Sequence, residues 1–367
     1  MQICHITSTI EGASGVATFV RELDTSLRAR GVDSRVGVDV STITSFPNSS
    51  SHPLLHTPTL PLPHSSTPPL PHFDLIHIHG LWLKMYHHAA AWARAKGIPV
   101  VCSTHGMTAP WSMNHKWWKK QVAWWLYQRR DLKQAAAIHC TTELEVGWNK
   151  ALGFNNCFIA PLGTRESSEF RVNSQLTTHN YTLLFVGRIY PVKGLVNLIK
   201  AWSLIEPRNT LNTRKWVLRI VGPDEAGHQA SLQSLVSQLS LESSVEFPGP
   251  KFGAELTAEY ENCDCLVLPS FTENFGATIV DALAHGKPVI TSSFTPWKEV
   301  QDRGCGWWVS NEPVQLASAI GEMMSLDDSM RREMGAKGRK LVEEKYTWDA
   351  VAHTMINEYQ KVISSCQ

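Results

Sequence analysis

Residues 266–286 read LVLPSFTENFGATIVDALAHG, which is a short apolar run, a loop and a helical pattern in direct succession. Leu266–Pro269 predicts a buried strand, and the apolar residues after Gly276 predict a helix that ends near Gly286, ahead of Pro288. A strand followed at once by a helix is the unit from which parallel sheets are built. This stretch therefore predicts an α/β fold with a ligand site where the strand ends and the helix begins.

Apolar runs and helical patterns alternate along the rest of the chain and start afresh at Tyr181, after a polar, aperiodic linker at Arg165–Thr178. At roughly 150 residues per domain, the 367 residues predict two doubly wound, Rossmann-like parallel-sheet domains. We place them at residues 1–167 and 178–346, with a helix at about 347–367 that packs back onto the first domain. A ligand crevice is expected where the strand ends of the two domains face each other. Strands are expected near Ile3–Thr7, Ser34–Val40, Leu75–Gly80, Val100–Gly106, Ala137–Cys140, Cys157–Ala160, Tyr181–Gly187, Trp216–Val221, Val245–Phe247, Leu266–Pro269, Val289–Thr291 and Trp307–Val309.

The composition is that of a soluble globular protein, with 43% hydrophobic residues. Lys and Arg number 34 against 33 Asp and Glu, which argues against nucleic acid as the main partner. The sequence shows neither a signal peptide nor a membrane span, and its eight scattered cysteines are expected to be reduced, so a cytoplasmic protein is expected. Cys263 and Cys265 are expected on one face of a strand, and residues 45–72, rich in Pro, Ser and His, predict a long loop.

Two carboxylates flank the start of the helix predicted after Gly276. The N–H groups and partial positive charge at a helix start suit a diphosphate. Glu273 on one side and Asp281 on the other could then hold hydroxyls of a sugar ring and of a ribose. The alternative is that Glu273 only complements the helix dipole and that Asp281 is a solvated helix residue.

Further candidates also lie at predicted strand ends. In Gly187–Gly194, Arg188 can fork two phosphate oxygens and Lys193 can add a point charge, although basic residues after strands are common on surfaces. The turn Gly12–Gly15 lacks the full dinucleotide spacing. His105 precedes a glycine, and a single histidine is more often structural. A metal role for His77 and His79 is disfavoured, and no D-x-D pair is present, so no metal site is expected.

Taken together, Gly12–Gly15, His105, Arg188 with Lys193, and Glu273 with Asp281 resemble glycosyltransferase family four in their order and predicted elements. The resemblance covers nearly the whole chain and is closest in Val186–Gly194, Val221–Pro223 and Leu268–Ser292. It implies the GT-B fold and transfer of a hexose, with retention and without a metal. The donor would be a nucleotide diphosphate sugar, UDP-glucose in the first place, and the acceptor a saccharide or a lipid-linked molecule in polysaccharide or glycoconjugate biosynthesis.

The same resemblance implies roles for individual residues. His105, Arg188, Lys193 and Glu273 would act at the reacting centre, and the donor would also be bound by Gly15, Phe247, Gly249, Asn274, Phe275, Gly276, Ala277 and Asp281. Two departures stand out. Asp281 replaces the usual Glu, so the ribose contact is expected to be looser, and Pro161–Gly163 reads Pro-Leu-Gly in place of Pro-Asn-Gly, so no site role is assigned there.

Residues 111–133 interleave tryptophans with basic side chains. The tryptophans are Trp111, Trp117, Trp118, Trp124 and Trp125, and the cations are Lys116, Lys119, Lys120, Arg129, Arg130 and Lys133. Such a mixture is typical of a membrane interface and would suit a lipid-linked acceptor at the cytoplasmic face of a membrane. The alternative is a packed helix whose tryptophans fill the core of the first domain.

Other functions remain open at this point. A nucleotide-sugar epimerase of the same fold would need acid and base groups around the sugar that we cannot locate. A Rossmann oxidoreductase would need the full glycine fingerprint and a following acidic residue. A non-catalytic nucleotide-sugar-binding protein is compatible with every motif above.

Overall fold

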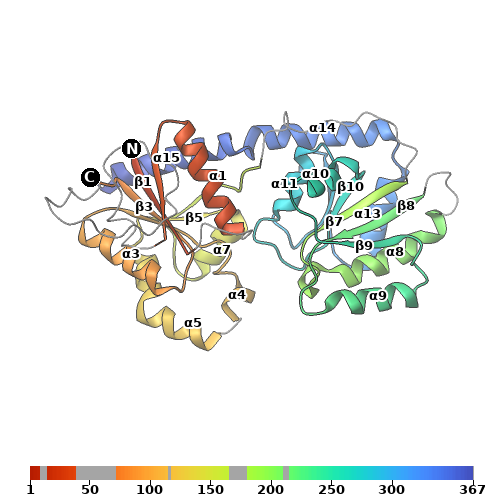
Figure 1. Ribbon diagram of the computed structural model, residues 1–367, viewed down its shortest axis with the longest axis horizontal. Coiled ribbons are helices and arrows are strands. Elements are labelled where there is room, and N and C mark those ends of the chain that lie inside the picture. Colours follow the sequence, from red (N-terminus) through yellow and green to blue (C-terminus); the bar gives the residue numbers. More distant parts are fainter. Residues whose placement is uncertain (9–14, 39–71, 115–116, 165–179, 210–214, 367) are drawn as a thin grey trace, which may run out of the picture. The chain divides into compact units, whose positions relative to one another are not determined.

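The computed structural model describes residues 1–8, 15–38, 72–114, 117–164, 180–209 and 215–366 (Figure 1). The chain forms two compact units, one of Met1–Gly163 with Trp348–Gln367 and one of Thr164–Thr347. Each unit is built around a six-stranded sheet in which every strand pair is parallel.

In the first unit the strands run in the order β2-β1-β3-β4-β5-β6. The helices α1 and α15 pack together on one face, where Phe19, Leu23 and Tyr359 are buried, and α3 covers the other face. The bounds are β1 Gln2–Thr7, β2 Asp33–Gly37, β3 Leu75–His79, β4 Val100–Ser103, β5 Ala137–Cys140, β6 Cys157–Ile159, α1 Gly15–Ala29, α3 Lys84–Ala95, α4 Pro110–Asn114, α5 Trp117–Ala123, the π-helix η1 Trp124–Gln128, α6 Arg129–Gln134, α7 Glu143–Ala151 and α15 Trp348–Cys366.

In the second unit the order is β12-β11-β10-β7-β8-β9. Here α8 and α9 lie on one side of the sheet and α10 and α11 on the other (Figure 1). The bounds are β7 Tyr181–Val186, β8 Trp216–Val221, β9 Val245–Gly249, β10 Cys265–Leu268, β11 Val289–Ser292, β12 Gly306–Val309, the 3-10 helix η3 Pro191–Lys193, α8 Leu195–Asn209, α9 His228–Gln238, α10 Gly253–Asn262, α11 Ala277–Ala284, α12 Glu299–Asp302, α13 Pro313–Ser325 and α14 Asp328–Lys345.

This strand order decides where a ligand site can form in the second unit. The chain adds β8 and β9 on one side of β7 and then returns to add β10, β11 and β12 on the other. After β7 and β10 the chain therefore continues to opposite sides of the sheet, so the ends of these two strands form a topological switch point, which is where doubly wound sheets bind ligands. The loops directly after β7 and β10 contain the predicted segment Gly187–Gly194 and residues 270–276, which belong to the predicted strand–loop–helix stretch 266–286.

Predicted and observed elements agree closely, with a few local differences. The strand expected at Ser34–Val40 ends at Gly37, and Cys263 follows the end of α10 and does not lie on a strand with Cys265. All eight cysteines are free. The loop 45–72, apart from His72, and the linker 165–178 lie outside the described residues, as do Gly12, Ser14 and Lys116. Within the described ranges, no helix combines the length and apolar character needed to cross a bilayer.

Candidate functional site

The loops after β7 and β10 meet through their backbones. Gly194 has a φ of 71°, and a Cβ placed on it would lie 2.2 Å from the carbonyl oxygen of Pro269. The Phe271 amide donates to the Val192 carbonyl at 2.8 Å. A glycine at 194 is therefore required both by the left-handed backbone and by the close approach of the second loop.

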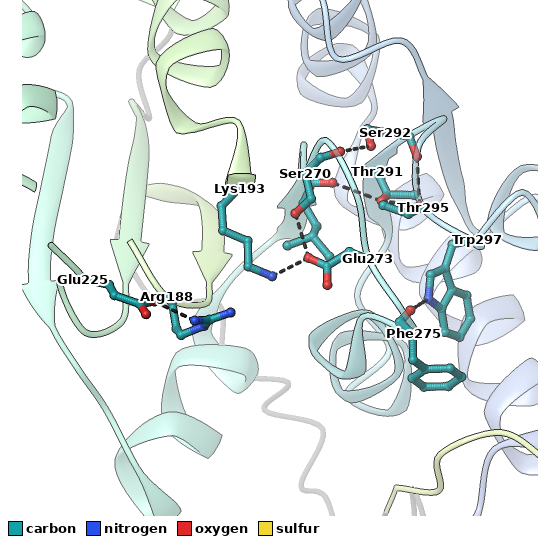
Figure 2. A network of polar contacts seen from close by, with 11 residues as sticks. Arg188, Lys193, Glu225, Ser270, Glu273, Phe275, Thr291, Ser292, Thr295 and Trp297 are labelled. Carbon is teal, nitrogen blue, oxygen red and sulfur yellow. Dashed lines mark hydrogen bonds and ion pairs between the residues drawn. The ribbon is translucent and has the colours of Figure 1, made fainter. Parts of the chain in front are cut away.

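Lys193 and Glu273 form an ion pair across these two loops (Figure 2). The same carboxylate oxygen, Glu273 Oε1, accepts a hydrogen bond from Ser270 Oγ at 2.7 Å. The side chains are only 15% and 12% exposed, so each is held in one position by its partners. The structure thus brings together the cation predicted for the phosphates and the carboxylate predicted for the sugar.

Arg188 lies on the same loop as Lys193 but has a different partner. Its Nη1 contacts Glu225 Oε2 at 2.6 Å, and the guanidinium side chain is 58% exposed (Figure 2). An exposed ion pair of this kind adds little to stability, because water screens both charges. Arg188 can therefore exchange Glu225 for an anionic ligand at small cost.

Hydrogen bonds from β11 and beyond stabilise the loop that leads into α11. Ser292 Oγ donates to the Ser270 carbonyl, and Trp297 Nε1 donates to the Phe275 carbonyl (Figure 2). Trp297 is buried and packs edge-on against the Phe275 ring. Gly276 follows with a φ of 86° and, in the described part of the chain, no side chain caps the helix that starts after it. The first amides of α11 are thus positioned for an anion.

The remaining residues of this unit that are predicted to bind the sugar donor lie on β9, on α11 and in the loop before α11. Asp281 is on α11, and its Oδ1 accepts a hydrogen bond from Thr164 Oγ1 at 2.9 Å. Phe247 and Gly249 are on β9, and the Gly249 carbonyl accepts from the Gly222 amide, beside the end of β8, at 3.1 Å. Asn274 and Ala277 flank Phe275 and Gly276 in the loop and at the helix start.

In the first unit, His105 follows β4 with a φ of 45°, a backbone conformation that is uncommon outside glycine. The buried carboxylate of Glu145 accepts hydrogen bonds from the two residues that flank His105. Thr104 Oγ1 donates to Glu145 Oε1 at 2.6 Å, and the Gly106 amide donates to the same oxygen at 2.5 Å. Burial lowers the pKa of His105 to about 4, so its ring is neutral near pH 7. Gly15 begins α1 and is exposed.

Three further histidines, His5, His77 and His79, are buried in the first unit, and His79 Nδ1 contacts His105 Nε2 at 3.3 Å. Within the described ranges, His5, His77 and His79 are the only cluster of potential metal ligands. Both ring nitrogens of His77 are already engaged, by Tyr359 Oη and by Ser103 Oγ, each at 2.6 Å. His5 Nδ1 and His79 Nε2 contact each other at 2.8 Å. This pairing favours a hydrogen-bonded core over a set of metal ligands, because a ligand needs an unshared nitrogen lone pair.

Tyr359, His77, Ser103 and His139 form a series of hydrogen bonds, and the last of these residues fixes which atom donates at each step. His139 Nε2 contacts the Ala160 carbonyl at 2.8 Å and must donate to it. In a neutral ring, His139 Nδ1 then accepts from Ser103, which accepts from His77 Nε2, and His77 Nδ1 accepts from Tyr359. The ring nitrogens of His77 and His139 in this hydrogen-bonded series are all satisfied only while both rings are neutral.

This core predicts loss of stability in acid. Burial lowers the pKa of His5 to about 3 and those of His77 and His79 well below their usual value. The unfolded chain therefore binds more protons below pH 6.5, and stability falls as the pH drops from there toward the folded-state values. Between pH 7 and pH 5 each of the three should remove up to about 2 kcal/mol from the free energy of unfolding. Denaturant titrations at both pH values test this, and equal stability would contradict it. Asp24 and Asp264, whose pKa values burial raises, act in the opposite direction.

The tryptophans of residues 111–133 divide into two kinds. Trp124 is buried against Trp82 and Phe154. The other four, Trp111, Trp117, Trp118 and Trp125, are 56%, 62%, 59% and 72% exposed. The alternative in which the tryptophans fill the core is therefore right for Trp124 and wrong for the other four.

Several residues that support these sites could not be recognised as functional from the sequence. Ser270, Ser292, Trp297 and Glu145 were given no role, although the two serines fall within the Leu268–Ser292 stretch of closest resemblance. Each acts through a contact made only in the folded chain.

Two families match the sequence along most of its length. Residues 166–341 match the glycosyl transferases group 1, and residues 14–156 match the glycosyl transferase 4-like domain. A D-inositol 3-phosphate glycosyltransferase of Salinispora tropica is 29% identical over 52% of this chain and 40% of its own. An uncharacterized glycosyltransferase of Methanocaldococcus jannaschii is 31% identical over 55% of this chain and 50% of its own. The matched part thus spans half or less of these relatives.

Solved structures resemble the chain over its full length. Sucrose-phosphate synthase from Thermosynechococcus elongatus is 20% identical, with a TM-score of 0.71 over 100% of both chains. HepE from Anabaena, solved in complex with UDP-glucose, is 16% identical, with a TM-score of 0.72 over 100% of both. At these identities the likeness concerns the fold, and the predicted GT-B fold with two parallel-sheet domains is confirmed.

Proposed function

The chain belongs to the group 1 glycosyl transferases, and on that premise we propose that it transfers a hexose from a nucleotide diphosphate sugar with retention of configuration. The observation that carries the proposal is the Lys193–Glu273 pair at the switch point, next to the start of α11. UDP-glucose is the first donor to test, since HepE, of the same fold, was solved with it. The acceptor would be a saccharide or a lipid-linked molecule, and with the latter the protein would work at the cytoplasmic face of a membrane.

The chemistry requires stabilisation of a leaving diphosphate. Lys193, Arg188 and the first amides of α11 would bind its oxygens and stabilise the negative charge that develops as the glycosidic bond breaks. The ammonium of Lys193 would then be shared between the phosphate and Glu273. No metal is invoked, because these groups supply the positive charge.

Glu273 is proposed to hold hydroxyls of the donor sugar and not to attack it. Its Oε1 is already bound by Lys193 and Ser270, which leaves Oε2 for the sugar. Retention would follow from departure and attack on the same face, with no covalent intermediate. In the first unit, His105 and Gly15 keep the donor-contacting roles that the family resemblance implies. In the second unit, Asp281 would share its carboxylate between Thr164 and the ribose.

Binding of the donor should appear first as thermal stabilisation. A ligand that binds only the folded chain at 100 times its Kd adds about 2.7 kcal/mol to the free energy of unfolding. We therefore expect one nucleotide sugar, in a panel of UDP- and GDP-linked compounds, to raise Tm by several degrees, with the bare nucleoside as the control that has no diphosphate. A panel without any stabilising compound would contradict the proposal.

The products formed from the donor distinguish a transferase from an epimerase and from a non-catalytic binding protein. With the stabilising donor and no acceptor, slow release of nucleoside diphosphate and free sugar indicates a transferase. Conversion of the nucleotide sugar into a stereoisomer would indicate an epimerase, and binding without any product would indicate a non-catalytic binding protein.

A further inference from the structure

Residues 117–134 present a continuous apolar face to solvent. Trp118, Val122, Trp125 and Leu126 follow one another at spacings that place them on one side of a helix, and all four are more than half exposed. Single exposed apolar residues are ordinary, but a contiguous group of this size indicates a binding surface. We call these four residues the tryptophan surface.

The opposite side of the same segment is attached to the core of the first unit. Trp124 and Gln128, which bound the π-helix η1, are both buried. Gln128 Oε1 accepts from the Trp82 amide at 2.7 Å, and Tyr127 Oη donates to the Trp82 carbonyl at 2.5 Å. The tryptophan surface is thus held outward by a packed helix and is not the result of a frayed end.

The charges around this surface are almost all positive. Residues 117–134 contain five cations, Lys119, Lys120, Arg129, Arg130 and Lys133, and one carboxylate, Asp131. Of the cations, Lys120 lies on the attached side, where it contacts the Ser112 carbonyl and the Trp82 ring. Asp131 is buried, with Arg94 at 2.9 Å and His87 at 2.8 Å, so it does not offset the cations outside. The whole chain has a formal net charge of only +1, so the positive charge here is a local concentration.

We propose that the tryptophan surface docks onto an anionic lipid bilayer. Tryptophan rings settle at the headgroup level, and adjacent lysines and arginines are attracted to lipid phosphates. A protein partner fits less well, because lysine is depleted in protein interfaces, whereas here Lys119 directly follows the exposed Trp117 and Trp118 and its ammonium lies over the Trp118 ring. Docking would place the first unit beside a membrane-held acceptor. This benefit for sugar transfer rests on the proposed function, whereas the binding to lipid does not.

Sedimentation with lipid vesicles tests the docking. We expect the chain to sediment with vesicles of phosphatidylcholine and phosphatidylglycerol at low salt, less so at about 0.5 M salt, where charges are screened beyond a few ångströms. It should not sediment with phosphatidylcholine alone. The double variant Trp118→Ser/Trp125→Ser should bind the anionic vesicles at least about tenfold more weakly, because two apolar side chains are lost from the contact. Phe252→Ser removes an aromatic side chain that is 65% exposed in the second unit, and should bind as the parent does.

Several outcomes would overturn the docking. These are equal binding to neutral and anionic vesicles, unchanged binding of the double variant, or a dimer in solution that the double variant abolishes. The affected side chains are exposed, so the variant should keep the parent's Tm. Donor hydrolysis without lipid provides the second readout: vesicle binding without hydrolysis rejects the transferase and keeps the docking, and hydrolysis without vesicle binding does the reverse.

Discussion

Replacing Lys193 by alanine is expected to lower kcat for sugar transfer by about 100- to 1000-fold, the usual effect of removing one preorganised donor from a developing negative charge. The ammonium is held by Glu273 and is only 15% exposed, so it is in place before the leaving diphosphate forms. Arg188→Ala should also cut turnover by orders of magnitude, and its exposed side chain leaves the fold unaffected. Steady-state rates with saturating donor measure both.

Two further variants distinguish phosphate binding from simple loss of the ion pair. Lys298→Ala removes an exposed lysine of the same unit and should leave kcat unchanged. If Lys193→Ala acted only by leaving the Glu273 charge unpaired, adding Glu273→Gln would restore the affinity for the bare nucleoside diphosphate, which has no sugar for Glu273 to hold. We expect no recovery in the double variant, because the phosphate still lacks its cation. Near-normal turnover of Lys193→Ala would reject its assignment to the phosphates.

Replacing Gly194 by alanine should destabilise the second unit by at least about 3 kcal/mol, through a left-handed backbone and a steric collision together. Its φ is 71°, and the added Cβ would lie 2.2 Å from the Pro269 carbonyl oxygen. To relieve the overlap, the loop that carries Lys193 must move away from the loop that carries Glu273. Sugar transfer should therefore fall as well, even where the variant still folds. Denaturant unfolding and the rate of transfer measure the two effects.

Gly227→Ala separates the two causes. Gly227 has a φ of 73°, but a Cβ placed on it meets nothing within 4 Å. This variant should cost only about 1 kcal/mol, the price of the left-handed backbone alone, and should keep full activity. Equal destabilisation by the two substitutions would show that the contact between the two loops is unimportant.

The sheets were predictable because buried parallel strands form nearly continuous apolar runs, which end at glycines or at polar residues. Trp216–Val221 was located at its observed bounds for this reason, and the predicted Tyr181–Gly187 runs one residue past the observed end at Val186. Cys263 was placed wrongly on a strand because alternation alone cannot show where a strand begins. There the Asp264 carboxylate accepts from the Thr182 amide at 2.7 Å, and the strand starts only after it.

The candidate site was predictable only as separate segments. The residue types of Arg188, Lys193 and Glu273 suggested their chemistry, but the pairing of Lys193 with Glu273 joins residues 80 positions apart. It depends on the return of the chain to place β10 beside β7, which no local pattern indicates. Trp297 and Glu145 were missed for the same reason, because the sequence does not distinguish a tryptophan or glutamate that supports a site from one that does not.

The most direct test of the diphosphate site is a crystal structure of the chain with the nucleoside diphosphate that stabilises it most. The account predicts phosphate oxygens within hydrogen-bonding distance of Lys193 Nζ, the Arg188 guanidinium and the first amides of α11. A diphosphate bound elsewhere, with the Lys193–Glu273 and Arg188–Glu225 pairs undisturbed, would contradict it.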